Sequence, residues 1–359
     1  MCGSSPRHIR IVVPAYKSGK TITACIAALD RSAQDLDYEI FVVDDGGHPD
    51  LASLLSNFSV TIQQTGGGGS AAAARNLGAR GFGGDFLVFV DADVIVEADA
   101  LRSLLAPLED GRAQAAIGNY TDDIAGLSFC TSYKQLYVAC IYRRRSGYVI
   151  NDFWTAIGAV SRPVFDALGG FDGRIKGANG EDADLGMRMT RNGYRIFAVP
   201  DALGQHRHEQ TIGGIVKNDW RKGVLALRQC QAGQRALSDN LHATGRDIAS
   251  VLLSGATLAT AGLGLGLGGP HALVGSIVVL SLYAGMRADL VGCFCRQGGW
   301  FAVRSFAMMF GLDLLRAVCA ARLLWARSLT RSPSRLSSIA RNDDASLSLQ
   351  YAKRHAPKS

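Results

Sequence analysis

The sequence predicts an α/β domain, a mostly parallel sheet flanked by helices, followed by helices that associate with a membrane. Short apolar runs alternate with helical patterns from residue 9 to about residue 118. The runs are continuously apolar, which indicates parallel strands whose two faces are both covered. Further along, residues 248–269 contain no charge over 22 positions, which is long enough to cross a bilayer.

Each predicted strand is a short apolar run bounded by turn residues. In chain order these strands are 9–14 (IRIVVP), 38–43 (YEIFVV), 60–64 (VTIQQ), 86–90 (FLVFV), 113–119, 154–160 and 194–199. The helices predicted between them are 20–31, 49–57, 70–80, 97–108 and 127–142, with one more that ends at Gly193. Glycine there is typical of a helix C-terminus, because it adopts the left-handed conformation without strain.

The chain divides into three predicted regions: a catalytic domain at 1–235, membrane-associated helices at 236–328 and a basic disordered tail at 329–359. Residues 248–269 and 272–286 form a predicted transmembrane hairpin. Basic residues flank its outer ends but not its tip, which places both ends in the cytoplasm. Residues 300–325 mix charged with apolar residues and predict an interfacial amphipathic helix. The alternative for the hairpin is a buried helical pair in a soluble protein.

The net charge of +7 lies in the C-terminal part of the chain. Residues 287–359 hold 12 Lys/Arg and 4 Asp/Glu, so the remaining 286 residues carry about −1. This distribution argues against a nucleic-acid-binding face on the main domain. The eight cysteines show no paired CxxC spacing, which predicts free thiols in a reducing compartment. The first ten residues lack the apolar run of a signal peptide. We therefore expect the cytoplasmic membrane, with the catalytic domain facing the cytoplasm.

Acidic residues follow two of the predicted parallel strands. Asp44 follows YEIFVV, and Asp91 and Asp93 follow FLVFV. Parallel strands open their ligand crevice at these carboxyl ends. Residues two apart in extended backbone point the same way, so Asp91 and Asp93 can face one pocket. Two such carboxylates repel each other unless a positive group lies between them, and a Mg²⁺ or Mn²⁺ ion with phosphate ligands suits this arrangement.

A glycine-rich turn offers a competing interpretation. The segment Gly67-x-Gly69-x-x-Ala72 follows a predicted strand and opens a helix, and Asp91 ends the next strand. This order is typical of dinucleotide binding, as in an NAD(P)-dependent oxidoreductase. However, another strand–helix–strand unit without such a turn precedes it, and a ribose site requires one acid, which leaves Asp93 without a role.

A second acidic cluster opens a later helix. Glu181, Asp182 and Asp184 follow the glycine-rich loop 177–180. Acids in a first turn favour the helix dipole, but three exceed what a cap needs. One of them could act as a general base toward an acceptor hydroxyl. The segment QHRH adds His206 and His208, either of which could be a further metal ligand.

Taken in order, these motifs carry a resemblance. VVPAYKSGKTI, VVDDGG, ARNLGA, FVDADV, GGFDGRIKGANGEDADLGMRM and a downstream histidine resemble the family 2 inverting glycosyltransferases of the GT-A fold, over roughly residues 8–225. The resemblance implies a Rossmann-like sheet, a nucleotide-diphosphate sugar as donor and a divalent cation. With the C-terminal hydrophobic segments, it implies a glycosyltransferase attached to a membrane.

The resemblance also implies roles for individual residues. The donor-binding positions are Pro14, Ala15, Tyr16, Asp44, Arg75 and Asp91. Asp93 would bind the metal and the diphosphate, with His206 as a further metal ligand. Asp182 resembles the catalytic base, with Glu181 beside it. Lys17 stands where the family commonly has Asn, so the details of base recognition differ here.

The chain departs from the polymer synthases of this family. Their Gln-x-x-Arg-Trp motif is absent, since NDWRKG (218–223) and QAGQRA (231–236) do not match it. Two or three apolar segments are also too few for a polymer channel. We therefore expect transfer of a single sugar, with one base and no covalent intermediate, to a hydroxyl or phosphate acceptor. The hairpin suggests that this acceptor is lipid-linked or a cell-envelope glycan.

Overall fold

The structure is a computed structural model that describes residues 8–67, 69–144, 147–149, 151–175, 180–231, 245–267 and 270–330. The strands are β1 (His8–Ala15), β2 (Asp37–Asp44), β3 (Val60–Gln64), β4 (Phe86–Val90), β5 (Val94–Val96), β6 (Ala115–Tyr120), β7 (Gly147–Val149), β8 (Ile157–Ser161) and β9 (Ile196–His206). The helices are α1 (Ile22–Ser32), α2 (Leu51–Leu54), α3 (Ala71–Ala79), α4 (Ala100–Glu109), α5 (Phe129–Arg143), α6 (Arg162–Ala167), α7 (Glu181–Arg191), α8 (Ile212–Gln231), α9 (Gly245–Leu267), α10 (Pro270–Met286), α11 (Ala288–Cys295) and α12 (Gly299–Thr330).

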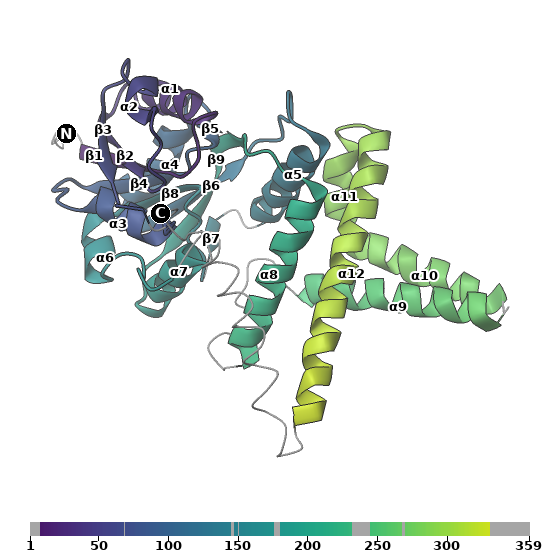
Figure 1. The fold of residues 1–359 in the computed structure, drawn as a ribbon. Helices are drawn as coiled ribbons and strands as arrows, with labels where there is room; N and C mark the ends of the chain where they lie inside the picture. The colour runs from purple at the N-terminus through teal and green to yellow at the C-terminus, as the bar shows by residue number, and fades with distance from the viewer. Residues whose placement is uncertain are drawn as a thin grey trace, which may run out of the picture.

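The described strands form one mixed sheet with helices on both faces (Figure 1). Its order is β3-β2-β1-β4-β8-β6-β9-β5, and β7 pairs with β9. The first four strands along the chain pair in parallel, as their alternation with helices predicts. β8 is antiparallel to both β4 and β6, and β9 is antiparallel to β5 and β7. The α/β fold is therefore confirmed, and its second half departs from a parallel arrangement.

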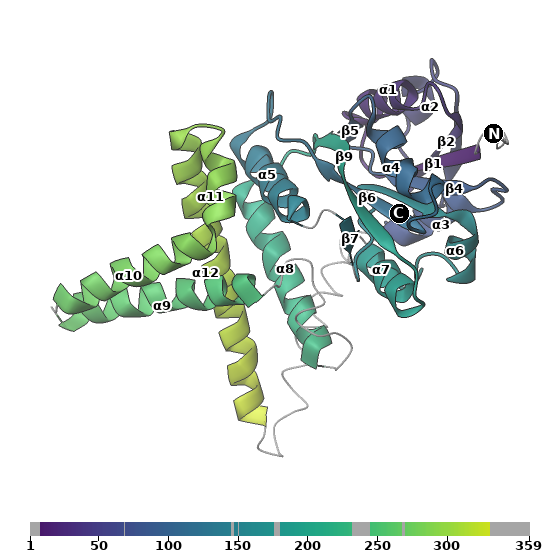
Figure 2. The same cartoon turned by 180° about the vertical axis from the view of Figure 1, so that it is seen from behind.

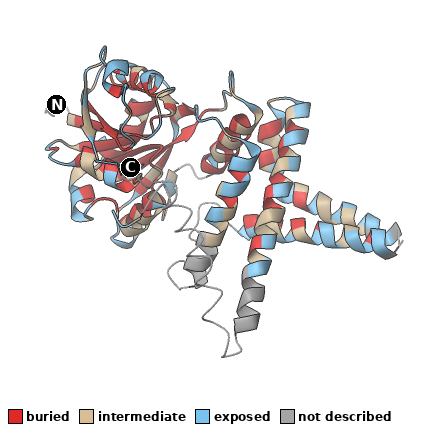
Figure 3. Ribbon diagram, in the orientation of Figure 1, coloured by how far each residue is buried: buried red, intermediate tan, exposed pale blue. Residues whose placement is uncertain are grey.

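Both faces of the central strands are covered. All five residues of β4 are buried, and buried apolar side chains form a cluster on each side of the sheet. Figure 3 shows this concentration of buried residues in the sheet. Helix α3 lies very close to the sheet, since a Cβ atom on Gly78 would come within 2.4 Å of the Val12 side chain. Burial of one large aliphatic side chain stabilises a fold by about 1.5–3 kcal/mol, so these strands anchor the domain.

Strand β9 runs further than the sequence pattern predicts. The predicted strand ends at residue 199, whereas β9 continues through Pro200 to His206. Its last residues pair with β5, a strand of three residues that the sequence did not predict, and Val94 stands opposite His206. The proline is tolerated because β9 changes register against β6 between Ile117 and Asn119.

The C-terminal helices extend away from the sheet. Helices α9 and α10 lie side by side as a hairpin in both Figure 1 and Figure 2, over the ranges where two apolar helices were expected. Their outward residues are apolar and exposed, among them Leu252, Leu263, Leu265, Val274, Ile277, Val278 and Leu282. Within the described residues, one helix (Gly245–Gly266) is long and apolar enough to cross a membrane. A second span would require two helical segments to cross together, although they are bent by 75° relative to each other. These segments are Leu273–Met286 and Ala288–Cys295.

A chain of ion pairs occupies the base of the hairpin. Arg287 is 2% exposed and binds Asp247 of α9 and Asp313 of α12. Asp313 also accepts from Tyr283 Oη, at 2.9 Å, and from Arg316, at 2.6 Å. Arg316 in turn binds Asp219 of α8. These contacts join four helices, and in this way they hold the hairpin to the helices that lie on the catalytic domain.

Cys140 of α5 and Cys293 of α11 form a disulfide with a Cα–Cα distance of 6.8 Å. The prediction that all the cysteines are free thiols is therefore wrong for this pair. The spacing of the two in the sequence gave no sign of the bond, because it joins elements that come together only in the folded chain. The predicted tail lies, from residue 331 on, outside the described residues, as does the predicted boundary at residue 235.

Candidate active site

Arg75 lies at the centre of a charged cluster that joins three elements. It projects from α3, is 4% exposed, and donates from Nη2 to Asp91 Oδ1 at 2.7 Å and from Nη1 to Glu181 Oε1 at 2.8 Å. Asp91 follows β4, and Glu181 begins α7. The guanidinium group therefore joins the end of the central strand to the start of the acidic helix. Its Nε atom has no hydrogen-bond partner among the described residues.

Two acids near Arg75, Asp91 and Asp182, hold their protons more tightly than free carboxyl groups. Burial raises the pKa of Asp91 to about 6; Arg75 opposes this rise, and the charge of Asp93 adds to it. The pKa of Asp182 is also raised, first by burial and then by Glu181, while Arg75 opposes the shift. Both effects follow from placing several negative groups in a partly dry site. The site therefore favours a bound positive charge.

Asp93 faces two histidines. Its Oδ1 atom lies 3.6 Å from His206 Nε2, and its Oδ2 atom lies 3.5 Å from His208 Nδ1. The backbone supports this arrangement, because Arg207 N donates to Asp93 O at 2.7 Å. Burial lowers the pKa of His206, which keeps its imidazole neutral and able to bind a metal. Among the described residues, no set of three or more His, Cys, Asp or Glu side chains is arranged to hold a metal ion alone.

Aromatic rings line the region between Asp93 and the acidic helix. The ring of Tyr120 stacks on His206 at 5.2 Å and meets Trp154 edge-on at 4.6 Å. Trp154 also contacts Tyr142, whose hydroxyl donates to Asp152 at 3.1 Å. The sequence analysis missed these rings, because they come from three separate segments. They provide flat apolar surfaces beside the carboxylates.

Helix α7 is held tightly at its start. Gly180 precedes it with φ +93°, a conformation that glycine adopts at little cost. Within the helix, a Cβ on Gly186 would come within 2.5 Å of the backbone of Asp152 and Phe153. This close approach fixes where Glu181 and Asp182 stand. Gly177, at the start of the glycine-rich loop noted in the sequence, lies outside the described residues.

Asn76, next to Arg75, anchors the segment that leads to α7. Its side-chain nitrogen donates to Phe171 O at 2.8 Å, and its side-chain oxygen accepts from Phe171 N at 2.9 Å. Helix α3 therefore contacts the acidic cluster through Arg75 and the preceding loop through Asn76. The ARNLGA motif contains both residues, yet we had assigned a role to Arg75 alone.

The predicted nucleotide-side residues gather at the ends of β1 and β2. Asp44 is buried, and its carboxylate accepts from the backbone N–H groups of Gly46 and His48 at 3.0–3.3 Å. It therefore shapes the loop after β2. Ala15 is buried and accepts from Asp45 N at 2.9 Å, whereas Tyr16 is 51% exposed and lies over Gly46. Pro14 pairs with Val43, one residue earlier in the same ladder.

The structure weighs against the dinucleotide interpretation. Gly67 and Gly69 do adopt positive φ values ahead of α3, and Ala72 is buried in that helix. However, the turn follows β3, which stands at the edge of the sheet. Asp91, the acid that would bind a ribose, is bonded to Arg75. The glycine turn therefore serves to begin α3.

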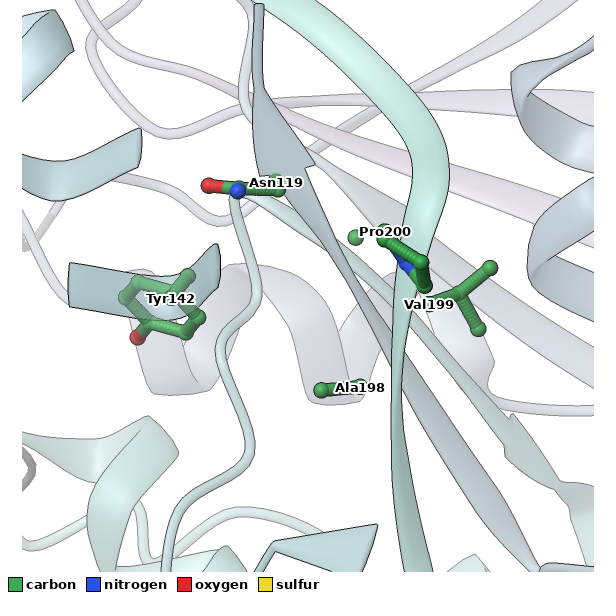
Figure 4. A pocket seen from close by; sticks show the side chains of 6 residues that line it. Asn119, Tyr142, Ala198, Val199 and Pro200 are labelled. Atoms are coloured by element: carbon green, nitrogen blue, oxygen red, sulfur yellow. The ribbon is translucent and has the colours of Figure 1, made fainter. Parts of the chain in front are cut away.

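A small cavity lies apart from the acids. It is lined by Gly118, Asn119, Tyr142, Ala198, Val199 and Pro200 and encloses about 10 Å³ (Figure 4). That is close to the space of one water molecule, so it cannot hold a nucleotide or a sugar. The candidate site is thus defined by the charged cluster and not by this cavity.

Comparison with known proteins assigns the domain. Residues 10–169 match the family described as Glycosyl transferase family 2. The chain is 28% identical over 155 residues to Glycosyltransferase GlyG of Streptococcus pneumoniae, covering 39% of this chain and 50% of that one. It is 22% identical over 358 residues to an N-acetylglucosaminyltransferase of Rhizobium sp., covering 91% and 78%. The chain thus spans only half the length of the pneumococcal relative.

A solved structure shares the fold over most of its length. It is mannosyltransferase PcManGT from Pyrobaculum calidifontis in complex with GDP-Man and Mn²⁺, with a TM-score of 0.55, 19% identity, and coverage of 90% of this chain and 88% of that one. The resemblance seen in the sequence motifs is confirmed over residues 10–169, which match the glycosyl transferase family 2, and the solved structure shares the fold.

Proposed function

We propose that the protein transfers a single sugar, with inversion, from a nucleotide-diphosphate sugar to a hydroxyl or phosphate acceptor at the cytoplasmic face of a membrane. The observation that carries this proposal is the bridge of Arg75 between Asp91 and Glu181. It brings the acids after β4 into one site with the acids of α7. Donor activation and deprotonation of the acceptor require two such groups near one reacting carbon.

The residues present fit a divalent cation. Asp93 and the neutral His206 offer one carboxylate and one imidazole, and a donor diphosphate would complete the shell, as is usual for Mg²⁺ or Mn²⁺. The bound cation would supply positive charge to the leaving diphosphate. The structurally similar PcManGT was solved with Mn²⁺ and GDP-Man, which supports the same assignment here. Pro14, Ala15, Tyr16 and Asp44 would hold the nucleoside end.

Asp182 would act on the acceptor side. Burial and the neighbouring Glu181 raise its pKa, which makes its carboxylate a stronger base than that of an ordinary aspartate. It takes the proton of an acceptor hydroxyl as the oxygen attacks the anomeric carbon, and the bond to the diphosphate breaks on the opposite face. Glu181 does not share this task, because its carboxylate is buried and bonded to Arg75.

Attachment to a membrane is supported by the exposed hairpin. Helix α9 has 23 residues, or about 34 Å at 1.5 Å per residue, which matches a hydrocarbon core of about 30 Å. Many apolar residues of α9 and α10 are exposed, and the two helices project away from the sheet (Figure 3). Such a location supports a lipid-linked or cell-envelope glycan as the acceptor.

A thermal-shift assay with purified full-length protein tests the donor. UDP- or GDP-sugars should raise the melting temperature only with Mn²⁺ or Mg²⁺, and Asp93→Ala should abolish this effect. Stabilisation by NADH alone would favour an oxidoreductase instead. For the membrane, a chain truncated after Arg246 should lose activity on lipid-linked acceptors; full activity of this soluble fragment on a water-soluble acceptor would count against attachment.

A further inference from the structure

Helix α8 presents a lysine without an ionic partner in the described part of the chain. One face of α8 carries Ile215, Asp219 and Lys222. Asp219 lies four residues after Ile215 and three before Lys222, and residues at these spacings are neighbours on a helix surface. Ile215 is 1% exposed and Asp219 is 7% exposed, which shows that this face points inward. Lys222 lies on the same face but is exposed, and the ion pairs of the described residues do not include it. The inner face of α8 thus ends in an available ammonium group.

A second lysine stands across from this face. Lys134 of α5 lies 3.6 Å from Asp219, which also binds Arg316 of α12. Two cations therefore contact the Asp219 carboxylate, and the charge of Lys222 also acts on it. Burial lowers the pKa of Lys134 and Asp219 opposes this, while the nearby charges of Lys222 and Arg316 lower it further. The group has a surplus of positive charge and would be stabilised by an anion.

The two lysines flank the proposed catalytic centre. Lys134 precedes Gln135, whose Oε1 atom accepts from His206 N at 2.9 Å. On the other side, burial raises the pKa of Asp182, and the charge of Lys222 is among those that oppose the rise. Through Arg316 the same cluster reaches Asp313 at the base of the hairpin. The lysines therefore belong to a charged network that reaches from residues of the proposed catalytic centre to the base of the hairpin.

We propose that Lys222 and Lys134 form a seat for a phosphate monoester on the acceptor. This inference rests on the proposed function and specifies its substrate class. A phosphate dianion attacks the anomeric carbon with an oxygen lone pair, forming one C–O bond as the C–O bond to the diphosphate breaks. Atoms and charge balance without proton transfer. The position beside the hairpin favours a phosphate carried by a lipid over a soluble one.

Binding to full-length protein in detergent tests the seat. The probes are farnesyl monophosphate, farnesol and inorganic phosphate. Their binding is measured by the change in the tryptophan fluorescence of the protein. We expect Lys222→Gln to weaken the binding of farnesyl monophosphate about tenfold. This is the usual effect of losing one charged contact of about 1.4 kcal/mol. Lys217→Gln is the matched control, because Lys217 is exposed on the same helix but points away from Asp219. Farnesol should bind all three proteins equally.

Binding of UDP and GDP with Mn²⁺ is measured in parallel. If Lys222→Gln binds farnesyl monophosphate as tightly as the parent, the seat is overturned, even where nucleotide binding is intact. If inorganic phosphate binds as tightly as the lipid phosphate and shows the same loss in Lys222→Gln, the seat stands and its ligand is a soluble phosphate. Failure of every nucleotide to bind the parent would instead contradict the proposed function.

Discussion

His206 Nε2 lies 3.6 Å from Asp93 Oδ1, although the two residues are far apart in the chain. The antiparallel pairing of β5 with β9 produces this contact, because it sets Val94 opposite His206. Two residues further on, His208 approaches the other oxygen of the same carboxylate. A ladder of three residue pairs thus assembles the proposed metal ligands from two distant motifs.

This arrangement predicts different effects at the two histidines. His206→Ala should lower the affinity for nucleoside diphosphates in the presence of Mn²⁺ by about tenfold or more. Removal of a metal ligand costs at least as much affinity as loss of a residue that supports a ligand. His208→Ala should have a smaller effect, because its side chain is 60% exposed and less firmly positioned. Isothermal titration with GDP and UDP across a Mn²⁺ series measures both. Equal losses would show that the two imidazoles serve the metal alike.

Arg75→Lys should reduce turnover more than donor binding. Lysine keeps the charge but lacks the planar group that binds Asp91 and Glu181 together. A displacement of one carboxylate by about 1 Å costs on the order of 100-fold in rate. Steady-state kinetics with the identified donor would separate kcat from KM. An unchanged kcat with a raised KM would mean that Arg75 contacts the donor directly, as the family resemblance first implied.

Asn76→Ala should slow the reaction by loosening the loop before α7. The change removes two hydrogen bonds to Phe171, each worth about 0.5–1.5 kcal/mol of stability. Nucleotide affinity should change little, because the residues proposed to hold the nucleoside lie at the ends of β1 and β2. Asn192→Ala is the control, since the side chain of that exposed asparagine donates to Arg188 O within the end of α7. A loss confined to nucleotide affinity would contradict this role.

The sequence predicted the parallel half of the sheet, because its strands are buried on both faces and read as continuous apolar runs. It did not predict β5 or the extension of β9, since three residues give no periodic signal and Pro200 argues against a strand. Of the site, Asp93 and His206 lie close together, and their role as metal ligands stays a prediction. Arg75 was expected on the donor, and its bond to Glu181 could not be foreseen from residues in separate motifs.

The raised pKa of Asp182 predicts a pH dependence that differs between acceptor classes. Burial favours the protonated carboxyl, so the base is lost at a higher pH than for an ordinary aspartate as the solution is acidified. Rates toward a hydroxyl acceptor should therefore fall on the acidic side, and Asp182→Asn should remove most of the activity. A phosphate acceptor is already ionised near neutral pH and should show a flatter profile. The same profile for both classes would argue against Asp182 as the base.

The ion pairs at the base of the hairpin predict a large loss of stability on removal of Arg287. Its guanidinium is almost fully buried between Asp247 and Asp313, so Arg287→Leu leaves two buried carboxylates without their shared partner. Such a break costs about 3–5 kcal/mol. Arg102→Leu is the matched control, because Arg102 pairs with Asp35 at the surface, where a pair contributes about 1 kcal/mol or less. Urea unfolding of both variants in detergent compares them. Equal losses would mean that the buried carboxylates find other partners or become protonated, and the hairpin would then be held mainly by its apolar contacts.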